Sequence, residues 1–121
     1  MNTKLLGRWG EQMAAQYLKE KGYRITGMGY TCRFGEIDLI AESRKYVLFV
    51  EVKLRKSAAY VRPMEYVTAS KQQKLIRTAL MWLSENDTGK QPRFDVIEIC
   101  APEGAGGAVT IQHIEDAFRL D

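Results

Sequence analysis

Cysteine, histidine and long apolar runs are scarce in this chain, and each shortage excludes a class of protein. The two cysteines, Cys32 and Cys100, are too few for a disulfide framework or a four-ligand zinc site. No segment approaches the roughly 20 continuous apolar residues that span a bilayer, and the N-terminal residues lack the apolar core of a secretion signal. His113 is the single histidine, and a structural or surface role explains it better than a ligand role. We therefore expect a cytoplasmic protein without a membrane segment.

The composition that remains is typical of one globular domain. A chain of 121 residues fits a single domain over residues 1–121 with a modest core. Its 45% hydrophobic and 27% charged residues are ordinary for a globular protein. The net charge of +3 permits nucleic acid as a partner without requiring it.

Two neighbouring stretches, 35–40 and 47–53, organise the chain. Both are rich in branched residues and are separated by the polar run 42–45, so we expect two strands joined as a hairpin. The second stretch is apolar on both faces except at Glu51 and Lys53, which predicts a central strand covered on both sides. Charges on such a strand are costly unless something compensates them.

The hairpin connection decides whether these charges meet Asp38. Side chains alternate along a strand, and paired residues of an antiparallel hairpin share a face. A two-residue turn at Arg44 and Lys45 places Asp38 opposite Glu51, and a four-residue connection shifts the pairing but keeps the shared face. Neither turn residue favours the positive φ of a tight hairpin, so both lengths stay open. An odd connection without a bulge would separate the acids.

Two interpretations of this face follow from the residues alone. Mg²⁺ and Mn²⁺ bind carboxylate and carbonyl oxygens, so Asp38 and Glu51 would suit a metal site beside Lys53. A bound cation would also offset the crowded carboxylates. The alternative is an internal ion pair between Lys53 and one of the two acids.

The N-terminal region predicts an amphipathic helix that Asn2 or Thr3 caps and that ends near Lys21, before Gly22. Its buried stripe consists of residues at helical spacing: Leu6, Trp9, Gly10, Met13, Ala14 and Tyr17. Glu11 falls at the border of that stripe, where the pattern alone indicates a surface glutamate.

A second helix is predicted over residues 70–85, where Ser70 and Gln73 match a capping box. Its core face includes Leu75 and Trp82. Basic residues recur every three positions on another face: Lys71, Lys74 and Arg77. This face is either a solvated surface or a stripe that contacts phosphates.

The other segments predict strands and connections. A first strand opens at residues 23–25 and is interrupted or ended by the glycine run 27–29. Two later strands cover 93–100 and 109–114, and we interpret Asp95 as a satisfied strand-end carboxylate. The basic segment 54–63 contains Pro63 and predicts an irregular loop, of a length that is more often functional or mobile than inert.

Four motifs in fixed order carry a resemblance to known proteins. They are Gly-Arg-Trp-Gly-Glu at 7–11, Gly-Glu-Ile-Asp-Leu-Ile at 35–40, Phe-Val-Glu-Val-Lys-Leu-Arg at 49–55 and Arg-Phe-Asp-Val at 93–96. Together they resemble the PD-(D/E)xK nuclease superfamily, in particular its Holliday-junction-resolvase-like branch, and more closely the small bacterial YraN-type family. The Glu-x-Lys tripeptide alone is a weak signal, but the four motifs cover nearly the whole chain. One departure is Leu54, where similar sequences commonly carry Thr.

The resemblance implies an α/β fold with a mixed central β-sheet flanked by helices and a restriction-endonuclease-like core in the order αβββαβ. It implies Asp38 and Glu51 as metal ligands, Lys53 as the catalytic lysine and Glu11 as a further acid near the metal. The implied cofactor is Mg²⁺ or Mn²⁺. Glu36 belongs to the family motif without a clear role, and Lys53 or a nearby arginine could pair with it.

The implied function is a metal-dependent endonuclease that hydrolyses DNA phosphodiester bonds. Nothing resembles a base-reading element, so we expect selectivity for branched or structured DNA rather than for sequence. Junction resolution would require a two-fold homodimer. The candidate contacts to the DNA backbone are the basic residues Arg33, Arg55, Lys56, Arg62, Lys71, Lys74 and Arg77. The alternative is a nucleic-acid-binding or protein-interaction module that keeps this fold without efficient catalysis.

Overall fold

A mixed five-stranded sheet forms the centre of the molecule. The computed structural model describes residues 3–56 and 67–120. In this part of the chain the strand order is β1-β2-β3-β4-β5, with β3 and β4 parallel and the other neighbours antiparallel. The elements are α1 (Thr3–Glu20), β1 (Arg24–Cys32), β2 (Gly35–Glu42), β3 (Tyr46–Arg55), α2 (Ala69–Glu85), β4 (Gln91–Cys100) and β5 (Thr110–Phe118). The α/β prediction is confirmed, and the architecture is consistent with a restriction-endonuclease-like core.

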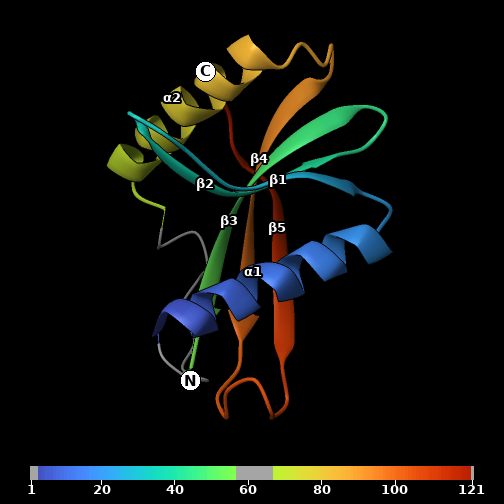
Figure 1. Cartoon of the computed structure of the whole chain (residues 1–121), viewed down its shortest axis with the longest axis vertical. Coiled ribbons are helices and arrows are strands. Elements are labelled where there is room, and N and C mark those ends of the chain that lie inside the picture. The colour runs from blue at the N-terminus through green and yellow to red at the C-terminus, as the bar shows by residue number, and fades with distance from the viewer. Residues whose placement is uncertain (1–2, 57–66, 121) are drawn as a thin grey trace.

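The two helices cover opposite faces of the sheet (Figure 1). Phe49 of β3 packs in a core cluster with Ile76 of α2, whereas its neighbour Val50 packs in a second cluster with Leu18 of α1. Successive side chains of a strand point to opposite faces, so both faces of β3 are buried, as its apolar pattern predicted. Neither described helix is long and apolar enough to cross a membrane.

The first strand is longer than the sequence predicted. β1 continues through the glycine run to Cys32, and its pairing with β2 shifts register between Ile25 and Gly27. A Cβ at Gly27 would lie 3.3 Å from the side chain of Ile40, so glycine permits close packing between the two strands. Of the two predicted alternatives, the strand is interrupted by a shift in register and does not end at the glycine run, because glycine also accommodates bulges inside strands.

The start of α2 also differs from the prediction. Thr68 is the N-cap, and its hydroxyl accepts a hydrogen bond from the backbone N–H of Lys71 at 3.2 Å. The predicted cap, Ser70, lies inside the first turn. Ser70 was predicted because a glutamine follows it at the capping-box spacing. Thr68, which is also a residue type that favours cap positions, was not considered. The predicted end at Glu85 is confirmed.

The β2–β3 hairpin has the shorter of the two predicted connections. Leu39 pairs with Val50 and Glu42 with Val47, a register that centres the turn on residues 44 and 45. The N–H of Ser43 donates to the carbonyl of Tyr46 at 2.9 Å, and the Ser43 hydroxyl accepts from the N–H of Tyr46 at 3.1 Å. The Ser43 hydroxyl therefore accepts the hydrogen bond that the Ser43 backbone carbonyl would accept in a regular hairpin. The sequence pattern gave no sign of this contact.

Candidate metal centre

The strands β2 and β3 separate at Asp38. Their last described pair is Leu39 with Val50. Asp38 is the residue before Leu39 on β2, and its Oδ2 accepts a hydrogen bond from the backbone N–H of Val52 at 2.8 Å. A carboxylate thus takes the place of a backbone acceptor where the ladder ends. The peptide of β3 thereby fixes the position of the Asp38 side chain.

The alternation of β2 breaks at the same residue. Leu39 belongs to the core cluster on the α1 side, while Ile37 belongs to the cluster on the α2 side. Residues two apart on a regular strand would share one face, so β2 turns as it leaves β3. The two strands are no longer paired at this point, and Asp38 lies there half-buried.

Three carboxylates meet at the point where β2 and β3 stop pairing. One oxygen from each of Glu11, Glu36 and Asp38 lies within 4.8 Å of the other two. Glu11 comes from α1 and the other two come from β2. Carboxylate oxygens are the ligands that hard divalent cations prefer. The donor set therefore fits a divalent cation.

Burial and mutual repulsion perturb these acids. Burial and the charge of Glu51 raise the pKa of Asp38 from 3.8 to about 7, with smaller contributions from Glu11 and Glu36, while the Val52 N–H opposes the rise. The pKa of Glu11 is also raised, by burial and then by Glu36 and Glu51, against the opposing charge of Arg8. A cation bound among these groups would relieve the repulsion.

Glu51 lies close enough to contribute to this repulsion, but its Oε1 forms an ion pair with Nζ of Lys71 at 2.8 Å. From the sequence, we expected either a metal or Lys53 beside Glu51, and we expected Lys71 among the residues that contact phosphates. Lys53 is half-buried on β3, two residues beyond Glu51 and therefore on the same face by alternation. It lies in register with Glu98 of the parallel strand β4.

Glu36 is the residue that the sequence analysis left without a role. The sequence did contain a sign that Glu36 belongs with the other acids: it is two residues before Asp38 on the predicted strand, and such residues lie on the same face of a regular strand. The structure therefore brings together Glu11, Glu36 and Asp38, with Glu51 beside them.

The predicted nucleic-acid contacts divide into groups. Arg55 is 11% exposed and pairs with Glu98 at 3.3 Å, so it stabilises the interior rather than the surface. Lys56, Lys74 and Arg77 are exposed. Arg33 is also exposed and stacks on the ring of Phe34, 4.8 Å from its centroid. Arg62 lies outside the described residues.

The turn between β1 and β2 lies against the basic face of α2. A Cβ at Gly35 would lie 3.2 Å from the hydroxyl of Thr78 and 3.9 Å from Cβ of Lys74. A shallow groove of about 380 Å³ runs between this turn and the helix, lined by Phe34, Arg77, Leu80, Met81 and Ser84. The groove joins an aromatic ring and apolar side chains to the basic residues.

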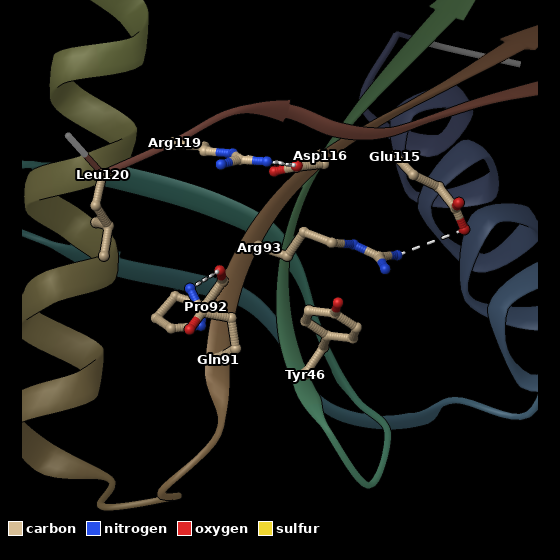
Figure 2. Close-up of a pocket in the computed structure, with 8 residues that line it drawn as sticks. All are labelled: Tyr46, Gln91, Pro92, Arg93, Glu115, Asp116, Arg119 and Leu120. Atoms are coloured by element: carbon tan, nitrogen blue, oxygen red, sulfur yellow. Dashed lines mark hydrogen bonds and ion pairs between the residues drawn. The ribbon is translucent and has the colours of Figure 1, made fainter.

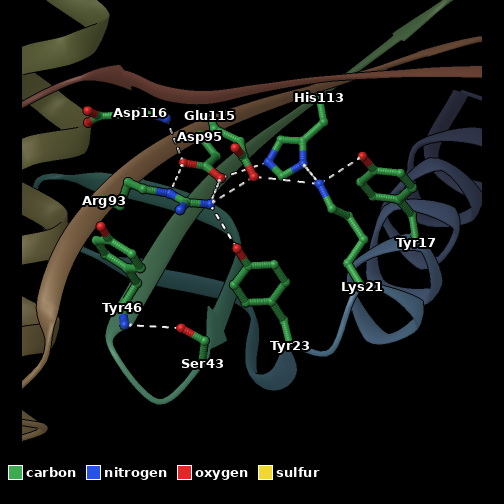
Figure 3. Close-up of polar contacts among 10 residues, drawn as sticks. All are labelled: Tyr17, Lys21, Tyr23, Ser43, Tyr46, Arg93, Asp95, His113, Glu115 and Asp116. Atoms are coloured by element: carbon green, nitrogen blue, oxygen red, sulfur yellow. Dashed lines mark hydrogen bonds and ion pairs between the residues drawn. The ribbon is translucent and has the colours of Figure 1, made fainter.

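A second polar network surrounds Asp95 on β4 (Figure 3). Its fully buried carboxylate accepts two hydrogen bonds from Arg93, at 2.9 and 2.8 Å, and lies 2.7 Å from Nε2 of His113. The hydrogen bonds from His113, Arg93 and the N–H of Asp116 hold the pKa of Asp95 below its usual value, against the opposing effect of burial. Asp95 is thus a satisfied carboxylate, and His113 has a structural role as expected.

A cavity of about 670 Å³ adjoins this network (Figure 2). Its charged side chains are already paired with one another. Arg93 lies 3.5 Å from Glu115, and Arg119 lies 2.9 Å from Asp116. We assign this cavity no ligand, because these pairs use the groups that would orient one.

This chain is similar to a known protein family, and the matched residues include the acidic cluster. The family model described as uncharacterised protein family UPF0102 matches residues 10–99. Similar proteins include the UPF0102 protein of Caldanaerobacter subterraneus, 42% identical over 119 residues and 98% of both chains. The UPF0102 protein of Syntrophus aciditrophicus is 44% identical over 94% of this chain and 88% of its own. That of Myxococcus xanthus is 39% identical over 93% and 87%. These matches confirm the resemblance at the level of the YraN-like family, and the descriptions name no activity.

Proposed function

The chain belongs to the UPF0102 family, and from its acidic cluster we propose that it is a metal-dependent endonuclease of the PD-(D/E)xK type that hydrolyses DNA. The observation that carries the proposal is the convergence of Glu11, Glu36 and Asp38 at the point where β2 leaves β3. Glu51 and Lys53 follow on the neighbouring strand, in the order that the superfamily motif requires.

In this proposal the acidic residues bind the metal ion, and Lys53 acts on the phosphate. Asp38, Glu51 and Glu11 would hold Mg²⁺ or Mn²⁺, and the exposed Glu36 would add a carboxylate at the rim. A bound metal ion lowers the pKa of water and stabilises charge on a phosphate. In the hydrolysis, the oxygen of water bonds to phosphorus as the bond to the leaving oxygen breaks. The attacking water loses a proton to solvent, and the leaving oxygen takes up a proton from solvent. The Lys53 ammonium neutralises negative charge on the phosphate as this happens.

The surface beside the cluster supports DNA as the substrate. Arg33, Lys74 and Arg77 lie around the β1–β2 turn and the facing side of α2. Contacts from such residues to phosphates position DNA without reading its sequence. The adjoining groove, with Phe34 and Leu80, offers apolar surface for an unstacked base, which favours branched or otherwise structured DNA.

A second candidate function is a nucleic-acid-binding module that does not cleave. The ion pair between Lys71 and Glu51 favours this alternative, because it compensates one of the acids without a metal. The same basic surface would then bind DNA, and the acidic cluster would be inert.

A cleavage assay separates the two functions. Linear, flap and four-way-junction DNA would be incubated with the purified chain and Mg²⁺ or Mn²⁺. We expect cleavage that Asp38→Ala and Lys53→Ala reduce by about 10²-fold or more. Glu20→Gln, an exposed position on the same helix as Glu11, serves as the control and should cut as the wild type does. DNA binding without cleavage under either metal, or equal cleavage by the variants, would contradict the nuclease proposal.

A further inference from the structure

Lys71 reaches the acidic cluster from a different element than the hairpin. It lies in the first turn of α2, where its backbone N–H donates to the N-cap hydroxyl of Thr68. Its ammonium group crosses to β3 and lies 2.8 Å from Oε1 of Glu51. The helix start is fixed by its cap, so the long side chain supplies the freedom to make or leave this contact.

The two side chains of this ion pair differ in their exposure to solvent. The side chain of Glu51 is 13% exposed, whereas that of Lys71 is 41% exposed. The carboxylate is therefore confined beside Asp38 and Glu11, while the lysine has access to solvent. If the pair opens, Lys71 regains hydration easily and Glu51 keeps a charge that needs a cation.

We propose that Lys71 and a divalent cation compete for Glu51, so that metal binding releases the Lys71 ammonium to contact a phosphate of bound nucleic acid. This inference rests on the proposed function and deepens it. Lys71 is a positioning residue for the acidic cluster and a metal-dependent contact for DNA. Occupation of the cluster then strengthens DNA binding, and DNA that holds Lys71 strengthens metal binding by the same factor.

A purely structural role predicts a different outcome. If the pair only joins α2 to β3, removing the ammonium destabilises the fold and leaves metal affinity unchanged or weaker. If Lys71 competes, removing it frees Glu51 and metal affinity rises. The sign of the change in metal affinity therefore distinguishes the two roles.

The test is calorimetric titration of the full chain with MnCl₂ in the absence of DNA. Lys71→Met keeps the aliphatic stem and removes the charge, and we expect it to bind Mn²⁺ about threefold to tenfold more tightly than the wild type. Lys71→Arg restores a cation and should return to wild-type affinity. Lys74→Met removes a charge three residues further along the same helix and should change the Mn²⁺ affinity less than twofold. It controls for the electrostatic effect of losing any positive charge from this helix. Unchanged or weaker Mn²⁺ binding by Lys71→Met would overturn the inference. Lys71→Gln provides a second neutral variant if Lys71→Met does not unfold cooperatively.

Glu51→Gln separates failure of this inference from failure of the proposed function. If the wild type binds Mn²⁺, Glu51→Gln binds it weakly and Lys71→Met matches the wild type, the metal centre stands and the competition is overturned. If wild type, Glu51→Gln and Asp38→Asn all bind Mn²⁺ equally weakly, the metal centre itself is overturned, and the nuclease proposal with it. Tighter binding by Lys71→Met that disappears in the Lys71→Met, Glu51→Gln double variant supports competition at this carboxylate.

Discussion

At the scale of single residues, Asp38 combines a fixed position with an unfavourable charge. The Val52 N–H holds its carboxylate where β2 and β3 stop pairing, while burial and neighbouring acids oppose its ionisation. Such a combination is common at functional sites, where a group is held ready for a ligand that compensates it. The cost of this charge should be measurable as a pH dependence of stability.

The folded chain binds a proton at Asp38 more tightly than the unfolded chain, because folding raises the pKa from 3.8 to about 7. The free energy of unfolding therefore falls as pH rises from about 4 to about 7. Asp38→Asn keeps an acceptor for the Val52 N–H and carries no charge. We expect the variant to be more stable than the wild type by about 2 kcal/mol at pH 8, and to differ little at pH 4.

Urea unfolding at the two pH values measures this difference, with Glu20→Gln as the control for loss of an exposed carboxylate. A wild type as stable as Asp38→Asn at pH 8 would contradict the expectation. Added Mn²⁺ should stabilise the wild type more than the variant, since the variant lacks the Asp38 carboxylate.

At the scale of elements, the start of α2 positions the basic face. Thr68 satisfies the N–H of Lys71, the residue whose side chain pairs with Glu51. The cap therefore stabilises the helix and fixes the backbone from which the lysine extends.

Thr68→Ala should lower the free energy of unfolding by about 1 kcal/mol, because the helix loses its capping acceptor. Ser70→Ala is the matched control: Ser70 is exposed inside the first turn, so its removal should cost no more than a few tenths of a kcal/mol. Chemical denaturation of both variants and the wild type measures these two changes in the free energy of unfolding. A larger loss for Ser70→Ala would restore the capping box that the sequence predicted.

The elements also show how far sequence reasoning reaches. Period-two alternation predicted the hairpin and the shared face of Glu51 and Lys53 on β3, because strand geometry is local. The loss of regular alternation at Asp38 was not predicted. The continuation of β1 past Gly27 was missed, because a bulge has no sequence pattern of its own and the close approach of Gly27 to Ile40 is a tertiary contact. The ion pair of Lys71 was missed for the same kind of reason. It depends on how α2 lies against β3, which tertiary packing decides.

At the scale of the whole molecule, the mild net charge of +3 hides an uneven distribution. Arg55 and Arg93 use their charges in buried pairs, whereas Arg33, Lys74 and Arg77 remain on the surface near the acidic cluster. Affinity for DNA should therefore depend on a few positions rather than on net charge.

Binding of DNA should weaken with salt, since phosphate contacts release counterions. The Lys74→Gln, Arg77→Gln double variant should lower the slope of log affinity against log salt concentration by about 2, with similar effects on all DNA sequences. Fluorescence anisotropy with Ca²⁺ in place of Mg²⁺ measures the slope. Loss of two other charges, in Lys19→Gln with Arg24→Gln, should leave it unchanged, and equal slopes for both double variants would remove α2 from the DNA surface.

The hydrogen bond between Val52 and Asp38 has a consequence for how this site can change over generations. The donor is a peptide N–H, which every amino acid except proline supplies. The side chain at position 52 can therefore vary in size and polarity, within the limits of the core cluster on the α1 side, without displacing the acid. Selection can alter the surroundings of the candidate centre while its central carboxylate stays in place.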